Sequence, residues 1–183
     1  MTKLLENNVA IVTGGASGIG KGIVKVLSHK GSAVAISDIN EKAAIELANS
    51  ININGGNAIG GMVDVKDKKT LDDFFHKTIE KFGHVDICVP NAGVVGAKDF
   101  SNRKDFIDDD WDLTLDVNLL GVRNTVESIK NHFIEENKGK IVIISSHGGR
   151  KPRGIGDKGR GNVQYPYLVS KAAVIQYMHL LAI

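Results

Sequence analysis

The sequence contains a single cysteine, Cys88, among its 183 residues. One cysteine excludes an intramolecular disulfide. Cys88 lies in the apolar run Val85–Val89, and a free cysteine behaves as a small apolar residue that is usually buried. We therefore expect a reduced, buried thiol at this position.

Long apolar runs are also lacking, and none approaches the length that a membrane span needs. Residues Met1–Glu6 show neither an apolar core nor a cleavage signature, so we do not expect a signal peptide. The sequence also lacks a large excess of charge of either sign, since 23 basic and 21 acidic residues leave a net charge of only +2. This balance gives no indication of nucleic-acid or membrane binding. The expected location is cytoplasmic.

What is present is an ordinary globular composition, with 42% hydrophobic and 24% charged residues. Apolar, β-branched runs alternate with longer amphipathic stretches, which predicts an α/β fold: a Rossmann-type, doubly wound parallel sheet in three layers. Residues 1–183 are expected to form one domain. The predicted strands are Val9–Val12, Ala33–Ser37, Ala58–Val63, Val85–Pro90 and Ile141–Ser145. The predicted helices are Gly18–Ser28, Glu41–Ile51, Lys68–Phe82, Trp111–Ile134 and Tyr165–Leu181.

A glycine-rich turn, Thr13–Gly20, joins the first predicted strand to the first predicted helix. In this context glycines indicate a dinucleotide site. Gly14 permits the tight turn, Gly18 lets the backbone approach a pyrophosphate, and Gly20 lets the helix pack close to the sheet. The start of the helix then offers N–H groups and a positive dipole end to the phosphates.

The second predicted strand is followed by an acidic residue, Asp38. A carboxylate there accepts hydrogen bonds from the adenosine ribose and repels the 2'-phosphate of NADP. Neither Ser17 nor Ile39 is basic, so nothing beside it would neutralise that phosphate. The sequence therefore predicts NAD rather than NADP. Asp38 could instead cap the helix that begins at Glu41, although Asn40 is better placed for that role.

Tyr167 and Lys171 are four residues apart, and so share one face of the last predicted helix. A phenol has an ordinary pKa of about 10, and an ammonium one turn away favours its ionised form. Such a pair suits general acid/base chemistry, with a serine hydroxyl from Ser145 or Ser146 to orient a carbonyl or alcohol. The spacing alone also occurs by chance on the surface of amphipathic helices.

These motifs together resemble the short-chain dehydrogenase/reductase family, in its short single-domain branch. The resemblance runs from Val9 to about Ala182 and keeps the family's order of motifs. Those motifs are Thr13-Gly14-x-x-x-Gly18-x-Gly20, Asp38, Asp64-Val65, Asn91-Ala92-Gly93, Asn118, Ser146 and Tyr167-x-x-x-Lys171. A Rossmann-like domain without redox chemistry is the alternative.

The resemblance implies the roles of the site residues. The catalytic residues would be Asn118, Ser146, Tyr167 and Lys171. Tyr167 would be the acid/base, and the backbone carbonyl of Asn118 would hold a water that relays protons. Taken without the resemblance, Asn118 could instead be an exposed polar residue. The cofactor-binding residues would be Gly14, Ser17, Gly18, Ile19, Gly20, Asp38, Asp64, Val65, Asn91, Ala92, Gly93, Tyr167 and Lys171. Asp64 could also cap the helix that follows. No metal site is expected.

Three neighbouring residues are not expected to be catalytic. Ser145 precedes the serine that fits the family's serine–glycine spacing, Ser146-His147-Gly148-Gly149. Tyr165 has Val169 rather than a lysine four residues later. His147 is expected to line the pocket or point outward.

Three features depart from the family pattern. Pro90 stands where the family usually has an asparagine, and proline removes a backbone donor from the strand end. The segment Gly149–Gly161 is longer than usual and carries five basic residues, which indicates either a solvated loop or a lid for an anionic substrate. The sequence also ends at Ile183, inside the helix of Tyr167, so we expect the family's substrate-loop region to be absent.

The predicted function is an NAD-dependent oxidoreductase that interconverts an alcohol and a ketone or aldehyde. The alternative is a nucleotide-binding or scaffold relative that cannot turn over. A lyase or epimerase on this scaffold would usually carry a larger C-terminal substrate domain. The expected partner is a small-molecule alcohol or carbonyl substrate, which could carry a negative charge. The resemblance also implies a homodimer or homotetramer.

Overall fold

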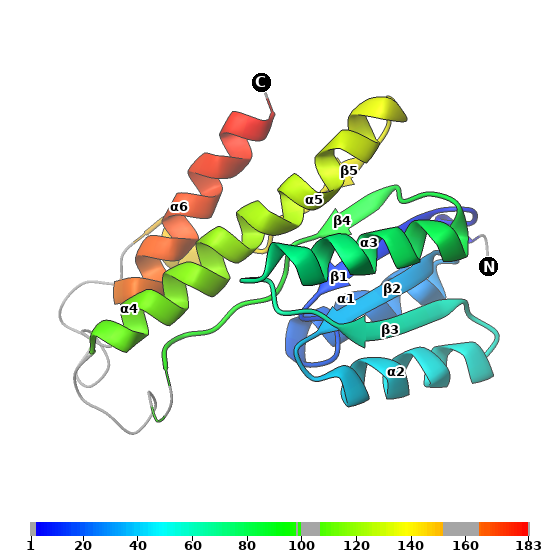
Figure 1. Ribbon diagram of the computed structural model, residues 1–183, viewed down its shortest axis with the longest axis horizontal. Coiled ribbons are helices and arrows are strands. Elements are labelled where there is room, and N and C mark those ends of the chain that lie inside the picture. The colour runs from blue at the N-terminus through cyan, green and yellow to red at the C-terminus, as the bar shows by residue number, and fades with distance from the viewer. Residues whose placement is uncertain (1–2, 98, 100–106, 152–164, 183) are drawn as a thin grey trace.

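A computed structural model describes residues 3–97, 99, 107–151 and 165–182. Its core is a parallel sheet of five strands in the order β3-β2-β1-β4-β5 (Figure 1). The strands are β1 (Val9–Thr13), β2 (Ala33–Asp38), β3 (Ala58–Met62), β4 (Ile87–Val89) and β5 (Lys140–Ile141). The strand order reverses at β1, since β2 lies on one side of it and β4 on the other. Crevices at such a switch point are where open α/β sheets bind ligands.

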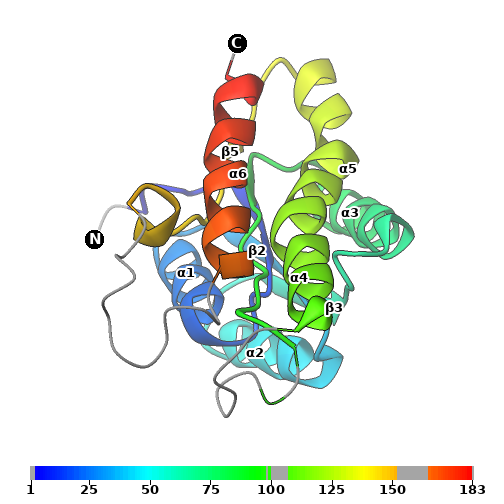
Figure 2. The same ribbon diagram turned by 90° about the vertical axis from the view of Figure 1, so that its left-hand side faces the viewer.

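Helices cover both faces of the sheet (Figure 2). They are α1 (Gly18–His29), α2 (Glu41–Ile53), α3 (Lys68–Phe82), α4 (Asp108–Leu115), α5 (Gly121–Glu135) and α6 (Tyr165–Leu181). The two-residue period of β1 divides the core, because Ala10 and Val12 pack toward α1 and α2 whereas Val9 and Ile11 pack toward α3 and α5. The predicted fold class, a three-layer Rossmann-type sheet, is confirmed.

Small residues in β3 let two helices pack close to the sheet. A Cβ on Gly60 would lie 2.4 Å from the Ala44 carbonyl oxygen of α2, and a Cβ on Gly61 would lie 2.6 Å from the Phe74 ring of α3. Both distances are shorter than van der Waals contact. The glycines of this strand therefore serve packing against α2 and α3.

The fifth strand is shorter than the predicted Ile141–Ser145. Its pairing with β4 ends at Cys88 and Ile141, although the N–H of Val142 still donates to Cys88 O at 2.9 Å and that of Ile144 to Pro90 O at 3.1 Å. Pro90 has no N–H with which to return a bond, so the regular ladder cannot continue. The predicted end of this strand was wrong because it followed the apolar pattern and did not take the missing N–H of Pro90 into account.

The helix predicted as one piece over Trp111–Ile134 is divided. Asp116–Leu120 form a π-helical turn between α4 and α5, closed by a bond from the N–H of Gly121 to Asp116 O. A π turn inserts one extra residue into a helix and is frequent at functional sites. Helix α6 packs against both α4 and this turn. The inserted residue changes which side chains face α6.

At the opposite end of the sheet, Asp86 joins three strands. Its Oδ2 accepts from the N–H of Val9 at 2.8 Å and lies 3.1 Å from His84 Nε2, while its Oδ1 pairs with Lys138 just before β5. Burial opposes ionisation of Asp86, but the hydrogen bonds from Lys138 and Val9 and the nearby charges of His84 and Lys138 outweigh it and lower its pKa.

Cys88 is fully buried in β4 as a free thiol, as predicted. Burial raises its pKa to about 12, so the reactive thiolate is not formed near neutral pH. Among the helices that the structure describes, none is long and apolar enough to span a membrane.

Candidate functional site

The turn after β1 has the backbone that its glycines predict. Gly14 and Gly18 have φ angles of +60° and +48°, in the left-handed region that favours glycine. A Cβ on Gly20 would lie 2.1 Å from Gly14 O, so only glycine fits where α1 begins. Ser17 is the residue before α1, and its side chain makes no capping bond. The first N–H groups of α1 are thus available to an anionic ligand.

Asp38 ties this turn to the end of β2. Its Oδ2 accepts from the N–H of Ala16 and its Oδ1 from the N–H of Asn40, both at 3.0 Å. Asn40, and not Asp38, caps α2 through a bond from the N–H of Ala43. A carboxylate can accept about four hydrogen bonds, so Asp38 retains acceptor capacity for ribose hydroxyls.

The residues after β3 and β4 close the next part of the site. Asp64 Oδ1 accepts from the N–H of Lys66 at 3.0 Å, whereas the cap of α3 is Asp67. The alternative role of Asp64 as that cap is therefore wrong. Asn91 Nδ2 donates to Thr13 O at 2.9 Å and to Gly14 O at 3.0 Å, which fixes the end of β4 to the glycine turn. Pro90 does not prevent this contact.

Asn118 lies in the π-helical turn and is fully buried, so the alternative of an exposed polar residue is wrong. Its Oδ1 accepts from the N–H of Val94 at 2.8 Å, and its Nδ2 donates to Val94 O at 2.8 Å and to Ser170 Oγ at 3.1 Å. Ser170 Oγ donates in turn to Tyr167 O at 2.8 Å. Asn118 thus connects the loop after β4 to the helix that carries Tyr167.

Lys171 extends beneath this loop from α6 and is only 4% exposed. Its Nζ donates to Ile144 O at 2.9 Å and lies 5.7 Å from the centre of the half-buried Tyr167 ring. Burial lowers the pKa of Lys171, because a buried ammonium loses hydration. The predicted pairing of Tyr167 and Lys171 on one helix face is therefore present in space.

The two serines at the end of the fifth strand have different environments. Ser145 Oγ donates to Lys171 O at 2.8 Å, and Ser145 lines the cavity described below. Ser146 Oγ accepts from the N–H of Gly148 at 3.2 Å and so caps the short 3₁₀ turn His147–Gly149. Ser146 and Asn118 are not among the residues that line this cavity. His147 is exposed.

One cavity of about 620 Å³ collects these elements at the carboxyl ends of the strands. All thirteen residues predicted to bind cofactor line it: Gly14, Ser17, Gly18, Ile19, Gly20, Asp38, Asp64, Val65, Asn91, Ala92, Gly93, Tyr167 and Lys171. The sequence did not single out its apolar wall, which is formed mainly by Ile39, Val63, Val94, Val95, Leu113, Val117 and Ile144. No spacing rule identifies these side chains, because they come from separate loops and helices.

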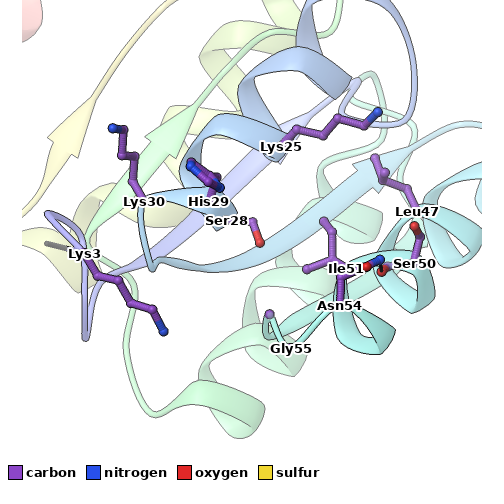
Figure 3. Close-up of a pocket in the computed structure, with 11 residues that line it drawn as sticks. Lys3, Lys25, Ser28, His29, Lys30, Leu47, Ser50, Ile51, Asn54 and Gly55 are labelled. Carbon is purple, nitrogen blue, oxygen red and sulfur yellow. Dashed lines mark hydrogen bonds between the residues drawn. The ribbon is translucent and has the colours of Figure 1, made fainter. Parts of the chain in front are cut away.

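A second cavity of about 600 Å³ lies where α1 and α2 end (Figure 3). It is lined by Lys3, Lys25, Ser28, His29, Lys30, Leu47, Ser50, Ile51, Asn54, Gly55 and Gly56. Since α1 rises about 1.5 Å per residue, this cavity is about 18 Å from the glycine turn. Figure 3 shows its lysine ammonium groups on separate sides of the pocket. It holds no residue of the predicted site.

Two predictions concern residues that the structure covers only in part. The basic segment Gly149–Gly161 is described up to Lys151, and 152–164 lie outside the described residues. Arg150 and Lys151 are exposed. No group of three or more metal-binding side chains occurs in the part of the chain that the structure describes.

Comparisons with known proteins agree with this geometry. A family model described as short chain dehydrogenase matches residues 8–183. The (2S)-[(R)-hydroxy(phenyl)methyl]succinyl-CoA dehydrogenase subunit BbsD of Thauera aromatica is 32% identical over 98% of this chain and 67% of its own length. The 3-oxoacyl-[acyl-carrier-protein] reductase FabG of Thermotoga maritima is 31% identical over 93% of this chain and 65% of its own. The chain thus spans about two thirds of the length of these relatives.

Solved structures are similar as well. The crystal structure of gox2181 has a TM-score of 0.85 at 32% identity, over 98% of this chain and 67% of that chain. A short chain dehydrogenase/reductase from Burkholderia phymatum in complex with NAD has a TM-score of 0.83 over 97% of this chain and 60% of its own. At 24% identity, this second similarity concerns the fold alone.

Proposed function

The chain belongs to the short-chain dehydrogenase family of oxidoreductases, and from that membership we propose that it interconverts an alcohol and a ketone or aldehyde with NAD. The observation that carries the proposal is a single cavity in which the glycine turn, Asp38 and the Tyr167–Lys171 pair meet. A nucleotide site and an acid/base pair on one cavity are what hydride transfer to or from a small molecule requires.

The residues present fit a dinucleotide. The turn before α1 supplies N–H groups for the pyrophosphate, and the side-chain-free positions at Gly14 and Gly18 allow close approach. Asp38 accepts from the adenosine ribose, and Asp64 with Val65 borders the adenine side. When bound, NAD supplies the hydride acceptor. Asp38 also favours NAD over NADP, because its carboxylate repels a 2'-phosphate.

The catalytic assignment follows from the other end of the cavity. Tyr167 takes the proton from the substrate hydroxyl in oxidation and returns it in reduction. Lys171 keeps two further N–H donors besides the bond to Ile144 O, which suits it to hold the nicotinamide ribose. Ser146 orients the substrate oxygen, and Asn118 supports the proton path to solvent. Because the cavity wall includes Ser145 but not Ser146, we include in the proposal an extension of the cavity toward Ser146 when substrate binds.

The non-catalytic alternative receives less support. The two relatives from Thauera aromatica and Thermotoga maritima are named a dehydrogenase subunit and a reductase. The distance of 5.7 Å between Lys171 Nζ and the centre of the Tyr167 ring also supports the proposed acid/base pair. Two of those names contain thioester carriers, succinyl-CoA and acyl-carrier-protein, which supports the proposal of an anionic substrate near the basic segment that begins at Arg150. A homodimer or homotetramer remains part of the proposal.

The test is a calorimetric titration of the 183-residue chain with NADH and with NADPH. We expect NADH to bind at least about tenfold more tightly, because one repelled phosphate costs more than 1 kcal/mol. The reverse preference would overturn the assignment of NAD. Binding of neither nucleotide would contradict the cofactor site itself.

A further inference from the structure

We propose that Ser145 is a positioning residue: it holds Lys171 in place, while the neighbouring Ser146 keeps the substrate-orienting role proposed above. The inference rests on the proposed function, in which Lys171 binds cofactor. Ser145 has a hydroxyl next to the catalytic serine, and the spacing of the family motif gives it no role. The position of Ser145 in the structure, by contrast, indicates a role.

Two consecutive residues hold opposite ends of Lys171. Ser145 Oγ donates to the backbone carbonyl of Lys171 at 2.8 Å, and the Nζ of Lys171 donates to the carbonyl of Ile144 at 2.9 Å. The Ile144 carbonyl and the Ser145 N–H belong to the same planar peptide unit. The hydroxyl bond of Ser145 therefore restricts the orientation of the very carbonyl that receives the ammonium.

The strand itself does little to fix that peptide. Regular pairing of β5 ends at Ile141, and the segment is then tied to β4 by single bonds such as Ile144 N–H to Pro90 O at 3.1 Å. On the other side, a Cβ on Gly149 would lie 2.6 Å from the Lys171 carbonyl carbon, so the chain passes directly against α6. Ser145 supplies the polar link in this contact.

Fixing Lys171 matters because the residue as a whole is almost completely buried. A buried lysine that loses a defined acceptor moves its flexible four-carbon stem toward water. Its ammonium would then leave the side of the cavity where Tyr167 lies. Loss of the Ser145 hydroxyl should therefore change both the environment of Lys171 and the affinity for the cofactor.

The experiment compares wild type, Ser145→Ala, Ser145→Thr and Ser32→Ala. Ser32 is a matched control: it is buried, and its hydroxyl donates to Asn8 O at 2.9 Å at the amino end of the strands, opposite the cavity. Lysine side-chain NMR follows the titration of the Lys171 Cε signal, which is assigned by its loss in Lys171→Arg. Calorimetry measures NADH affinity.

We expect Ser145→Ala to raise the titration midpoint of Lys171 toward the ordinary value of about 10.4 and to weaken NADH about three- to tenfold. Ser145→Thr keeps the hydroxyl and should restore both, whereas Ser32→Ala should change neither. If Ser145→Ala does not fold, Ser145→Cys decides in the same way, because its thiol keeps the volume but is a weak donor.

A wild-type midpoint and wild-type affinity in the folded Ser145 variant would overturn the inference. So would equal shifts in the Ser32 control, which would show a general loss of stability. If the wild-type chain binds no NADH, the proposed function fails, yet the Lys171 titration still decides the role of Ser145.

Discussion

Asp38 combines two tasks in one carboxylate, since it braces the turn through Ala16 and Asn40 and borders the cofactor cavity. We predict that Asp38→Asn raises the ratio of NADPH to NADH affinity at least about tenfold, because the repelling charge is gone. The amide also places an NH₂ against one of two backbone donors, so the free energy of unfolding should fall by about 1–3 kcal/mol. Calorimetry and urea denaturation measure the two effects.

Asp67→Asn is the control for this substitution. Asp67 also accepts from a backbone N–H, that of Lys69 at 2.9 Å, but it caps α3 and does not line the cavity. It should lose stability without changing the cofactor ratio. An unchanged ratio in Asp38→Asn would show that Asp38 does not select the nucleotide.

Lys171 is expected to lower the stability of the folded chain, because this charged residue is buried, while it contributes to cofactor binding. We predict that Lys171→Met lowers NADH affinity but leaves the free energy of unfolding at pH 7 within about 1 kcal/mol of wild type, because a buried ammonium is replaced by an apolar chain of similar size. Urea denaturation and calorimetry test this. A loss of several kcal/mol would show that Lys171 is mainly structural.

The difference in stability between wild type and Lys171→Met should depend on pH in a defined direction. The pKa of Lys171 is lower in the folded chain than in the unfolded chain, so folding is penalised while both states carry the charge. As pH rises through the window between the folded pKa and the ordinary value of about 10.4, wild type should gain stability relative to Lys171→Met. The difference in unfolding free energy against pH measures this gain.

Spacing could predict some of these residues but not others. The pattern Tyr167-x-x-x-Lys171 uses the helix period, and Asp38 ends a strand, so both can be located within a short stretch of sequence. The bonds of Ser145 and Ser170 join residues 26 and 52 positions apart. No local period relates such positions, and only the packed structure brings them together.

At the scale of elements, the π-helical turn places Asn118 against the loop after β4. We predict that Asn118→Ala lowers the free energy of unfolding by roughly 2–4 kcal/mol, because the fully buried Asn118 amide is lost and the half-buried N–H and C=O of Val94 both lose their partner. The hydroxyl of Ser170 loses its donor as well. Urea denaturation measures the loss.

Asn124→Ala provides the comparison from the next helix. Asn124 also donates to a backbone carbonyl, that of Val65 at 3.1 Å, but it is only partly buried. Its removal should cost less than about 1.5 kcal/mol. Similar losses in both variants would mean that the π-helical turn holds the loop no more tightly than an ordinary surface contact.

The π turn and the short fifth strand show why element boundaries were the weaker predictions. Both segments have the apolar pattern of regular structure, and the pattern located them correctly. The interruption coincides in one case with the buried amide of Asn118 and follows in the other from the N–H that Pro90 lacks. Periodicity reports which face is apolar, but not where one hydrogen bond is missing or added.

At the scale of the whole molecule, alternating strands and helices were sufficient to predict the layers. All five strands run parallel, so the glycine turn after β1, Asp38 at the end of β2 and Asn91 after β4 lie at the same end of the sheet. Asp86 stabilises the other end, away from the cavity. Stability and ligand binding should therefore be separable by mutation.

Asp86→Asn tests that separation. We predict that it lowers the free energy of unfolding at pH 7 by about 1–3 kcal/mol, since the bonds from Val9 and Lys138 lose a charged acceptor. The folded pKa of Asp86 lies below its usual value, so its contribution is complete above about pH 4 and is lost as pH falls through the folded pKa. Urea denaturation at a series of pH values should show the wild-type advantage disappear in acid.

NADH affinity should stay unchanged in Asp86→Asn, which distinguishes it from the substitutions at Asp38 and Lys171. Asp73→Asn is the surface control, because its pair with Lys69 at 2.6 Å is exposed and such pairs contribute little. An advantage that persists in acid would show that the carboxylate charge is not the source of the stability. A loss of NADH affinity would show instead that the two ends of the sheet are coupled through β1 and β4, whose strands run from Asp86 and Val9 to the cofactor cavity.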